Sequence, residues 1–337
     1  MTRAPVAIIG AGSWGTALAV HLAQVREVRL WCRSEDGPAE IDRARENRAF
    51  LPGVAIPPGV RVSDDLPAVL GGCGVAVLAL PTQFLRPFLG RRRDAAWPAG
   101  PLVLASKGIE VGSLLLPADI VGAELGEPAR ARAVAFSGPS FAREVALGHP
   151  TAVVAACPDE RHATAVQELF SHANLRVYTS PDRAGVQLAG ALKNVVAIAA
   201  GVADGLGFGA NATAALITRA LAEISRLGVR LGSRRDTFMG LAGLGDLVLT
   251  CTGEASRNRQ VGQQLGRGRA LPDILSGMRA VAEGVDTCRA AVALGARHAV
   301  SLPIAEQVHE ILFRGKDPRA ALAELLARPL RAEPEDE

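Results

Sequence analysis

A glycine-rich turn near the N-terminus constrains this sequence more than any other feature. The β-branched run 6–9 leads directly into Gly10-Ala11-Gly12-Ser13-Trp14-Gly15, which matches G-x-G-x-x-G, and residues 16–22 then have a helical pattern. Residues 28–31 predict a second strand, so the segment forms one βαβ unit. The first glycine permits the tight turn, the second lets phosphate approach the backbone, and the third lets helix and strand pack closely. The pattern therefore predicts a dinucleotide site at the start of the helix.

The residues after the second strand bear on which dinucleotide binds. An NAD-selective site usually has Asp or Glu at this place, about 20 residues beyond the glycine turn. This chain has Cys32-Arg33-Ser34 there, and the first acidic residue is Glu35. Arg33 is predicted to contact the 2′-phosphate of NADP, although a solvated arginine after a strand is an equally simple interpretation. The pattern favours NADP(H) and leaves NAD(H) open.

Strand and helix patterns alternate through the first half of the chain, which predicts a mostly parallel, doubly wound sheet. The further strand candidates are 75–80, 102–105, 133–136, 152–155 and 176–178, with helical segments such as 160–171 between them. From about residue 183 onward only helical patterns remain. They cover 186–203, 212–227, 259–265, 286–295, 304–313 and 318–326.

The sequence therefore predicts an α/β fold with a Rossmann-like domain over 1–181 and an all-helical domain over 182–330. Ser180, before Pro181, is expected to cap the first helix of the second domain. The polar tail 331–337 is expected to fray. The apolar run 195–203 has about half the length of a membrane-spanning helix and predicts a buried helix instead.

Composition excludes several classes of function. A formal net charge of +3 is too small to indicate a nucleic-acid or membrane-surface partner, and aromatic residues make up only 4% of the chain. The five cysteines form no CxxC pair and the histidines no HExxH pattern, so neither disulfides nor a metal site is predicted. Without a signal-peptide pattern at its N-terminus, the protein is expected to be cytoplasmic, with no insertion into a membrane.

Lysine is rare in this chain. Only three of the 37 basic residues are lysines, at positions 107, 193 and 316. Arginine stays charged in proteins, whereas a buried lysine can lose its proton. Lys107 and Lys193 therefore become candidates for chemistry that a guanidinium cannot perform, while Lys316 has no motif around it.

Several short segments that combine polar residues with glycines resemble one known family. They are Ser106-Lys107-Gly108-Ile109-Glu110, Ser137-Gly138-Pro139-Ser140-Phe141-Ala142, Leu192-Lys193-Asn194, Gly205-Leu206-Gly207-Phe208-Gly209-Ala210-Asn211, Gly243-Leu244-Gly245-Asp246-Leu247 and Thr250-Cys251-Thr252-Gly253-Glu254-Ala255-Ser256-Arg257-Asn258. Together with the glycine turn, these segments resemble the bacterial-type NAD(P)-dependent glycerol-3-phosphate dehydrogenases. The resemblance extends from Val6 to about Phe313.

The resemblance implies reversible reduction of dihydroxyacetone phosphate to sn-glycerol 3-phosphate, a precursor of membrane phospholipids, in a cleft between two domains. It implies cofactor positions at Ser13, Trp14, Arg33, Lys107, Ala142, Arg257, Val281 and Glu283. It implies substrate positions at Lys107, Gly138, Ser140, Lys193, Asp246, Ser256, Arg257 and Asn258, with Lys193 as catalytic base. The family often has two arginines after the second strand, and Ser34 replaces the second one here. A homodimer is compatible with the family, but no residue pattern indicates it.

The chemistry of Lys193 follows from its surroundings as well as from the resemblance. Oxidation of a secondary alcohol needs a base on the hydroxyl, and a free lysine titrates near 10.4, so burial or a nearby cation must lower its pKa. Lys193 begins the apolar run and Lys107 is a candidate for the nearby cation. Asp246 is expected to hold the ammonium form or to bind a substrate hydroxyl. From position alone, a lysine that flanks a buried helix is the simpler interpretation of Lys193.

Ser256-Arg257-Asn258 precedes a helix expected to begin near Arg259. A hydroxyl, a guanidinium and an amide at a helix N-terminus suit a phosphate group, although Ser and Asn are also common N-caps. Ordinary structural roles also remain open for other residues. Gly138, Ser140 and Asp246 are also common turn formers, and Glu283 beside Gly284 is also compatible with a simple exposed residue.

Two other functions remain open from the sequence. A β-hydroxyacid or 6-phosphogluconate-type dehydrogenase has a similar fold and a Lys-Asn pair on a helix, but residues 205–211 and 256–258 argue against it. An NADPH-binding sensor that has lost turnover is the second alternative. Intact Lys107, Lys193 and Asp246 argue against that alternative.

Overall fold

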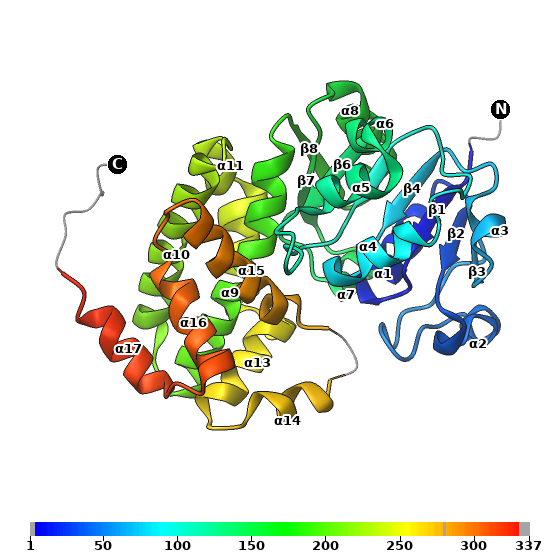
Figure 1. The fold of residues 1–337 in the computed structure, drawn as a ribbon. Helices are drawn as coiled ribbons and strands as arrows, with labels where there is room; N and C mark the ends of the chain where they lie inside the picture. The colour runs from blue at the N-terminus through cyan, green and yellow to red at the C-terminus, as the bar shows by residue number, and fades with distance from the viewer. Residues whose placement is uncertain (1–3, 279–280, 330–337) are drawn as a thin grey trace.

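The computed structural model describes residues 4–278 and 281–329 (Figure 1). The first half of the chain forms one eight-stranded sheet with the order β3-β2-β1-β4-β5-β6-β7-β8. All neighbouring strands are parallel except β6 and β7, so the predicted mostly parallel sheet is confirmed. The strands are β1 (Val6–Ile9), β2 (Val28–Trp31), β3 (Val60–Ser63), β4 (Val75–Leu78), β5 (Leu102–Leu104), β6 (Ala133–Ser137), β7 (Thr151–Ala156) and β8 (Leu175–Ser180).

β3 is not among the strands that the sequence predicts. Its sequence is Val-Arg-Val-Ser, and only Val60 is fully buried because the strand lies at one edge of the sheet. An edge strand has one free side, so it lacks the continuous apolar run that marks the central strands. Its register, with Val60 opposite Val28, extends the sheet beside the dinucleotide motif.

Helices cover both faces of the sheet, as the doubly wound pattern predicts. One face packs against α1 and α8, through side chains such as Leu18 and Phe170. The other face packs against α3, α4 and α5, through Leu66, Leu85 and Ile120. The helices of this half are α1 (Ser13–Leu22), α2 (Pro38–Ala44), α3 (Leu66–Leu70), α4 (Thr82–Gly90), α5 (Pro117–Leu125), α6 (Glu127–Ala131), α7 (Ala142–Ala146) and α8 (Glu160–Phe170).

The architecture changes after β8, which ends at Ser180. The expectation that Ser180 caps the next helix is wrong. Asp182 is the N-cap of α9 (Arg183–Gly205), and its Oδ1 accepts a 2.8 Å hydrogen bond from the Gly185 amide. Ser180 instead completes the pairing of β8 with β7.

The second half of the described chain is helical, as predicted, and surrounds α9 (Figure 1). It contains α10 (Ala210–Arg230), α11 (Arg235–Met239), a π-helical turn η2 (Leu241–Gly245), α12 (Asp246–Thr252), α13 (Arg257–Gly266), α14 (Leu271–Ser276), α15 (Glu283–Arg297), α16 (Pro303–Arg314) and α17 (Pro318–Leu326). The predicted tail 331–337 lies outside the described residues.

α9 is the centre of this half. It is long and apolar enough to cross a membrane by length and composition, but 89% of its most apolar stretch is buried inside the protein, which confirms the predicted buried helix. Glycines allow α13 to approach it closely. A Cβ added to Gly201 would lie 2.0 Å from the carbonyl oxygen of Arg259, and one added to Gly262 would lie 2.0 Å from that of Ile198. This packing fixes the start of α13 relative to Lys193 on α9.

Candidate active site

A cleft of about 990 Å³ is lined by residues from both halves of the chain. Most residues singled out in the sequence line this cleft. They are Gly10, Gly12, Ser13, Trp14, Arg33, Lys107, Ser140, Ala142, Lys193, Asp246, Ser256, Arg257, Asn258, Val281 and Glu283. Gly15 and Gly138 do not line the cleft, but each contacts a residue that does. Gly15 packs against Gly10, and the carbonyl oxygen of Gly138 accepts a hydrogen bond from Lys107. The sequence motifs thus converge on one cavity.

The glycine turn leaves space for a phosphate group. Gly10 has a φ of +111°, and an added Cβ would lie 2.7 Å from the carbonyl oxygen of Ala79. A Cβ on Gly15 would lie 1.9 Å from the Gly10 carbonyl oxygen, so this glycine lets α1 pack on the turn. At Gly12 an added Cβ meets nothing within 4 Å, and no side chain caps the helix. The N-terminal amides of α1 therefore suit an anionic group from the cleft, as a dinucleotide pyrophosphate requires.

Two lysines share one carboxylate at the other end of the cleft. Nζ of Lys193 donates to Oδ1 of Asp246 at 2.8 Å, and Nζ of Lys107 donates to Oδ2 at 2.7 Å. Lys107 also donates to the carbonyl oxygen of Gly138 at 3.2 Å, and Lys193 donates to Oγ1 of Thr250 at 2.7 Å. We call Lys107, Lys193 and Asp246 the lysine–aspartate cluster. It confirms the expectation that Asp246 holds an ammonium group.

Local structure positions Asp246. Asp246, for which the sequence left a turn-forming role open, is the first residue of α12. The preceding turn is π-helical, a conformation often found at functional sites. Within it, a Cβ on Gly243 would lie 2.0 Å from the carbonyl oxygen of Phe238, so the turn closes tightly on α11. One helical turn after Asp246, Thr250 presents its hydroxyl to the same lysine.

Burial changes the proton affinity of the cluster. Lys193 is only 6% exposed, and burial lowers its pKa from 10.5 to about 8, because removal from water disfavours the ammonium form. Asp246 opposes this shift and Lys107 adds to it. Burial alone would raise the pKa of Asp246, but the two neighbouring ammonium groups hold it below its usual value. The surroundings of Lys193 therefore bring its pKa closer to neutral pH than that of a free lysine.

A chain of amides links the cluster to α13 and α15. Asn194 donates from Nδ2 to the carbonyl oxygen of Lys107 at 3.0 Å, and Asn258 donates to Oδ1 of Asn194 at 3.0 Å. Oδ1 of Asn258 in turn accepts the amide of Gly284 at 3.0 Å. These bonds join one loop and three helices, so the cluster and the start of α13 have fixed relative positions.

The start of α13 faces the cleft. The helix begins at Arg257, two residues earlier than expected, and buried Ser256 is its N-cap, with Oγ accepting the Arg259 amide at 3.2 Å. The cap role that sequence alone left open for Ser256 is therefore observed. Arg257 is exposed to the cleft and no acidic residue lies in the first turn. The Arg257 guanidinium and the N-terminal amides of α13 lie together, and such a combination favours binding of a phosphate group.

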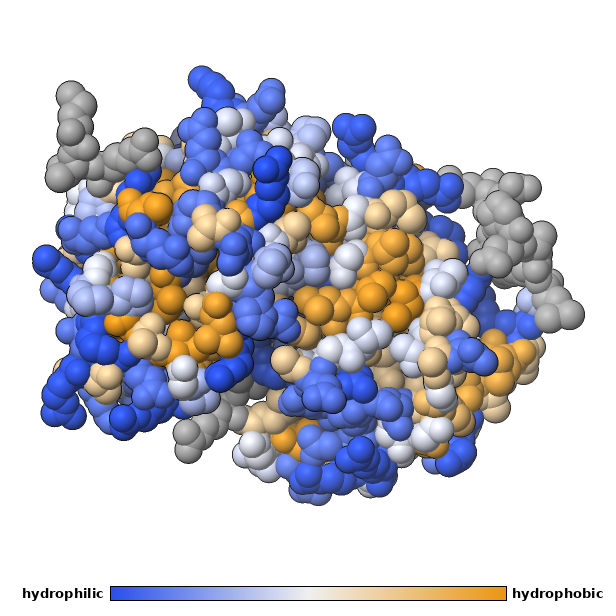
Figure 2. Space-filling model, turned by 180° about the vertical axis from the view of Figure 1, so that it is seen from behind, coloured by the Kyte–Doolittle hydropathy of each residue, from blue (hydrophilic) through white to orange (hydrophobic). Residues whose placement is uncertain are grey.

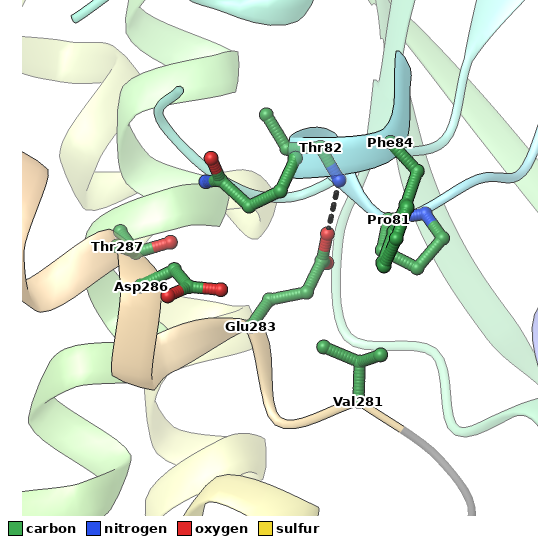
Figure 3. A pocket seen from close by; sticks show the side chains of 8 residues that line it. Pro81, Thr82, Phe84, Val281, Glu283, Asp286 and Thr287 are labelled. Carbon is green, nitrogen blue, oxygen red and sulfur yellow. Dashed lines mark hydrogen bonds between the residues drawn. The ribbon is translucent and has the colours of Figure 1, made fainter. Parts of the chain in front are cut away.

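Glu283 joins the two halves of the molecule (Figure 3). Its Oε1 accepts the backbone amide of Thr82 at 2.7 Å, at the start of α4, while Glu283 itself begins α15. Burial raises the pKa of this carboxyl. Glu283 is thus not a simple exposed residue, and Val281, 38% exposed, lies beside it on the cleft.

The remaining predicted cofactor residues occupy the glycine-turn side of the cleft. Oγ of Ser13 donates to the carbonyl oxygen of Phe50 at 2.6 Å, and the buried Nε1 of Trp14 has no hydrogen-bond partner among the described residues. Ala142 is the first residue of α7, and Ser140 donates from Oγ to the carbonyl oxygen of Gly138 at 2.9 Å.

Arg33 lies on the cleft rim and is already engaged by acidic neighbours. Its guanidinium donates to both carboxylate oxygens of Asp36, at 3.0 and 2.8 Å, and lies 2.7 Å from Oε1 of Glu35. Its side chain is 57% exposed. We call Arg33, Glu35 and Asp36 the rim cluster.

Sequence reasoning missed several cleft residues. Thr250 and Asn194 lie within the sequence motifs, but no role was predicted for either. Only the i,i+4 spacing of Thr250 from Asp246 could have indicated a role for Thr250. Asp36, Asp64 and two arginines of the α4 end also line the cleft, and no motif surrounds them. They meet there only through the fold of the sheet.

Comparison with known proteins identifies the family. The family model for the N-terminus of NAD-dependent glycerol-3-phosphate dehydrogenase matches residues 5–163, and the model for its C-terminus matches residues 182–323. The chain belongs to the NAD-dependent glycerol-3-phosphate dehydrogenase family. It is thus an NAD(P)-dependent dehydrogenase, and the alternatives of a 6-phosphogluconate-type enzyme and of a sensor without turnover are set aside.

Relatives named glycerol-3-phosphate dehydrogenase [NAD(P)+] match this chain over nearly the full length of both proteins. The glycerol-3-phosphate dehydrogenase [NAD(P)+] of Geobacter sp. (strain M21) is 48% identical over 97% of this chain and 98% of its own. That of Geobacillus kaustophilus is 46% identical over 98% of this chain and 96% of its own. The crystal structure of the Coxiella burnetii glycerol-3-phosphate dehydrogenase matches with a TM-score of 0.92 at 38% identity, covering 97% of this chain and 100% of that one.

Proposed function

We propose that Lys193 exchanges the proton in the reversible reduction of dihydroxyacetone phosphate to glycerol 3-phosphate by this enzyme. The observation that carries the proposal is a buried amine with a pKa of about 8, held by Asp246 and opening onto the cleft. A general acid or base acts best when its pKa lies near the working pH. Lys193 meets this condition because burial between α9 and α12 lowers its pKa.

In the reduction, the ammonium form of Lys193 donates a proton to the oxygen of the substrate carbonyl. In the oxidation, the neutral amine accepts the proton of the substrate hydroxyl. Asp246 orients the amine through the 2.8 Å bond, and Thr250 accepts a second one, so the third position on Nζ remains for the substrate. Lys107 supplies a second positive charge that favours the forming alkoxide.

The start of α13 is proposed to bind the substrate phosphate. Arg257 donates from its guanidinium, the helix N-terminus adds backbone amides, and Ser256 and Asn258 fix the local geometry. Ser140, which lines the cleft, is proposed to contact the same substrate. Gly138 is proposed to act through its carbonyl oxygen, which holds Lys107.

The nicotinamide dinucleotide fits the glycine-turn side of the cleft. When bound, NAD(P)H supplies the hydride for the substrate carbonyl carbon. The residues proposed to hold it are Gly10, Gly12, Ser13, Trp14, Gly15, Arg33, Lys107, Ala142, Arg257, Val281 and Glu283. The open space at Gly12 and the unpartnered Nε1 of Trp14 support this assignment. The domain boundary at 181/182 is proposed to separate the cofactor-binding half from the substrate-binding half.

A direct assay tests this proposal. Purified protein mixed with dihydroxyacetone phosphate and NADH or NADPH is expected to consume the reduced nicotinamide, followed by its absorbance. In the reverse direction, glycerol 3-phosphate is expected to be oxidised and 6-phosphogluconate is not. Oxidation of 6-phosphogluconate without oxidation of glycerol 3-phosphate would overturn the assignment of the phosphate site.

A homodimer and a cytoplasmic location complete the proposal. Figure 2 shows apolar residues over both halves of the molecule on the face opposite to Figure 1, and contiguous exposed apolar surface is typical of interfaces. Light scattering is expected to give twice the 35.0 kDa chain mass. A single-chain mass at micromolar concentration would contradict the dimer.

A further inference from the structure

We propose that Asp36, through its ion pair with Arg33, sets the preference of this enzyme between NAD(H) and NADP(H), so that Asp36 is a specificity-determining residue. This inference rests on the proposed cofactor side of the cleft. The two cofactors differ only at the ribose 2′ position, which carries a neutral hydroxyl in one and a phosphate dianion in the other. Discrimination between them is therefore a question of charge at the end of β2.

The Arg33 guanidinium, which would contact the 2′ position, is already paired with the two carboxylates of the rim cluster. Arg33 makes a two-pronged pair with Asp36, at 3.0 and 2.8 Å, and a third contact with Glu35. The paired geometry is the one that a carboxylate and a phosphate both use with arginine. A 2′-phosphate must therefore displace Asp36 or accept its repulsion, whereas a 2′-hydroxyl need do neither.

A second carboxylate lies beside the rim cluster. Oγ of Ser34 donates to Oδ2 of Asp64 at 2.6 Å, and the Asp64 carbonyl oxygen accepts Nε1 of Trp31 at 2.8 Å. Ser34 thus holds the negative Asp64 carboxylate close to the rim cluster. Both Ser34 and Asp64 line the cleft.

Two arginines offset these carboxylates. The guanidinium of Arg92 lies over the rings of Phe88 and Trp31, at 4.3 and 5.5 Å, and Arg91 is its neighbour at the end of α4. Within residues 4–278 and 281–329 neither arginine forms an ion pair, and both line the cleft. This end of the cleft therefore carries Arg33, Arg91 and Arg92 against Glu35, Asp36 and Asp64. The charges balance, which favours neither cofactor strongly, and one substitution is enough to tip the balance.

Fragment binding tests the proposal apart from turnover. The probes are 2′,5′-ADP and 5′-AMP, which carry the adenosine end of NADP and NAD, and their Kd values are measured by calorimetry. Asp36→Asn is expected to tighten 2′,5′-ADP about tenfold and to leave 5′-AMP within about twofold, because the guanidinium is freed and one negative charge is removed. Asp64→Asn is expected to act in the same direction with a smaller effect. The gain is expected to shrink as salt rises, since the site is exposed.

Asp42→Asn is the matched control. Asp42 pairs with Arg45 at 2.9 Å with the same i,i+3 spacing, but it does not line the cleft, so both Kd values are expected to stay unchanged. The ratio of kcat/KM for NADPH over NADH is expected to rise with Asp36→Asn and not with Asp42→Asn. Unchanged or weaker binding of 2′,5′-ADP by Asp36→Asn overturns the inference.

The outcomes separate this inference from the proposed function. If the Kd ratio shifts but dihydroxyacetone phosphate is not reduced, the rim assignment holds and the proposed substrate fails. If the substrate is reduced but neither the Kd ratio nor the kcat/KM ratio moves, the proposed function holds and the role of Asp36 is rejected.

Discussion

The lysine–aspartate cluster and the rim cluster are built from the same kind of contact in different surroundings. Nitrogen–oxygen distances are 2.7–2.8 Å in the first and 2.7–3.0 Å in the second. The side chains of Lys193 and Asp246 are 8% and 2% exposed. In the rim cluster Arg33 and Glu35 are 57% and 70% exposed, and Asp36 is 17% exposed. The two clusters therefore have similar nitrogen–oxygen distances but differ in how far water reaches their side chains.

This difference decides what each cluster does. Two unit charges 4 Å apart interact by about 1 kcal/mol in water and by about 4 kcal/mol at the effective dielectric of a protein site. The buried cluster therefore shifts a lysine pKa to about 8 and suits proton transfer. The exposed cluster interacts weakly and suits discrimination between two similar cofactors. The following predictions test this contrast, in order of decreasing effect.

Lys193→Arg is expected to lower kcat by about a thousandfold or more, because a permanently charged guanidinium cannot exchange the proton. Binding of NADH or NADPH, measured by fluorescence titration, is expected to remain. Lys316→Arg is the matched control, since Lys316 pairs with Glu324 outside the cleft and should keep full activity. Near-normal turnover by Lys193→Arg would remove this lysine from the mechanism.

Asp246→Asn is expected to lower kcat about a hundredfold and the free energy of unfolding by about 3 kcal/mol, because the buried ammonium group of Lys193 and the half-buried one of Lys107 lose their carboxylate. Urea denaturation and steady-state kinetics measure the two effects. Since Asp246 raises the pKa of Lys193, its loss is also expected to move the pH profile of turnover to lower pH. A stable variant with an unchanged profile contradicts the cluster.

Arg257→Ala is expected to raise the KM for dihydroxyacetone phosphate about tenfold and to change kcat much less, because one charge-assisted bond to phosphate is lost. Arg267→Ala, at the opposite end of α13, is the control and should leave KM unchanged. If only cofactor affinity changes, the phosphate does not bind at the start of α13.

Arg33→Gln is expected to change the free energy of unfolding by less than about 1 kcal/mol, as for other exposed ion pairs. Its effect should appear in cofactor choice alone, as weaker binding of 2′,5′-ADP with 5′-AMP unchanged. A large loss of stability would show that the rim cluster supports the fold, and the contrast with the buried cluster would fail.

Much of the fold could be predicted from sequence because its signals are local. The β-branched run before Gly10, the apolar face of α9 and the alternation of strands and helices each follow from a few neighbouring residues. β3 was missed because an exposed edge strand needs no continuous apolar run. Asp182 replaced Ser180 as the cap because the strand β8 extends to Ser180, which pattern alone does not show.

The site was less predictable because its contacts join distant segments. Lys107 and Asp246 are 139 residues apart and meet only when the fold brings the start of α12 to the loop after β5. Their motifs resembled a family, so the residues could be named, but the shared carboxylate and the bond to Thr250 required the structure. The rim cluster is the opposite case. Its residues are neighbours in sequence, yet the ion pair that engages Arg33 leaves no motif.

The pH dependence of kcat/KM for glycerol 3-phosphate oxidation tests the central claim most directly, because this quantity reports ionisations of the free enzyme. Oxidation requires the neutral amine of Lys193, whose fraction rises as pH increases through its pKa. The rate is therefore expected to rise from pH 6 to a plateau above an apparent pKa of about 8. The rate of dihydroxyacetone phosphate reduction, which requires the ammonium form, should fall through the same pKa. A profile for oxidation that stays flat between pH 6 and 9 would contradict proton transfer by Lys193.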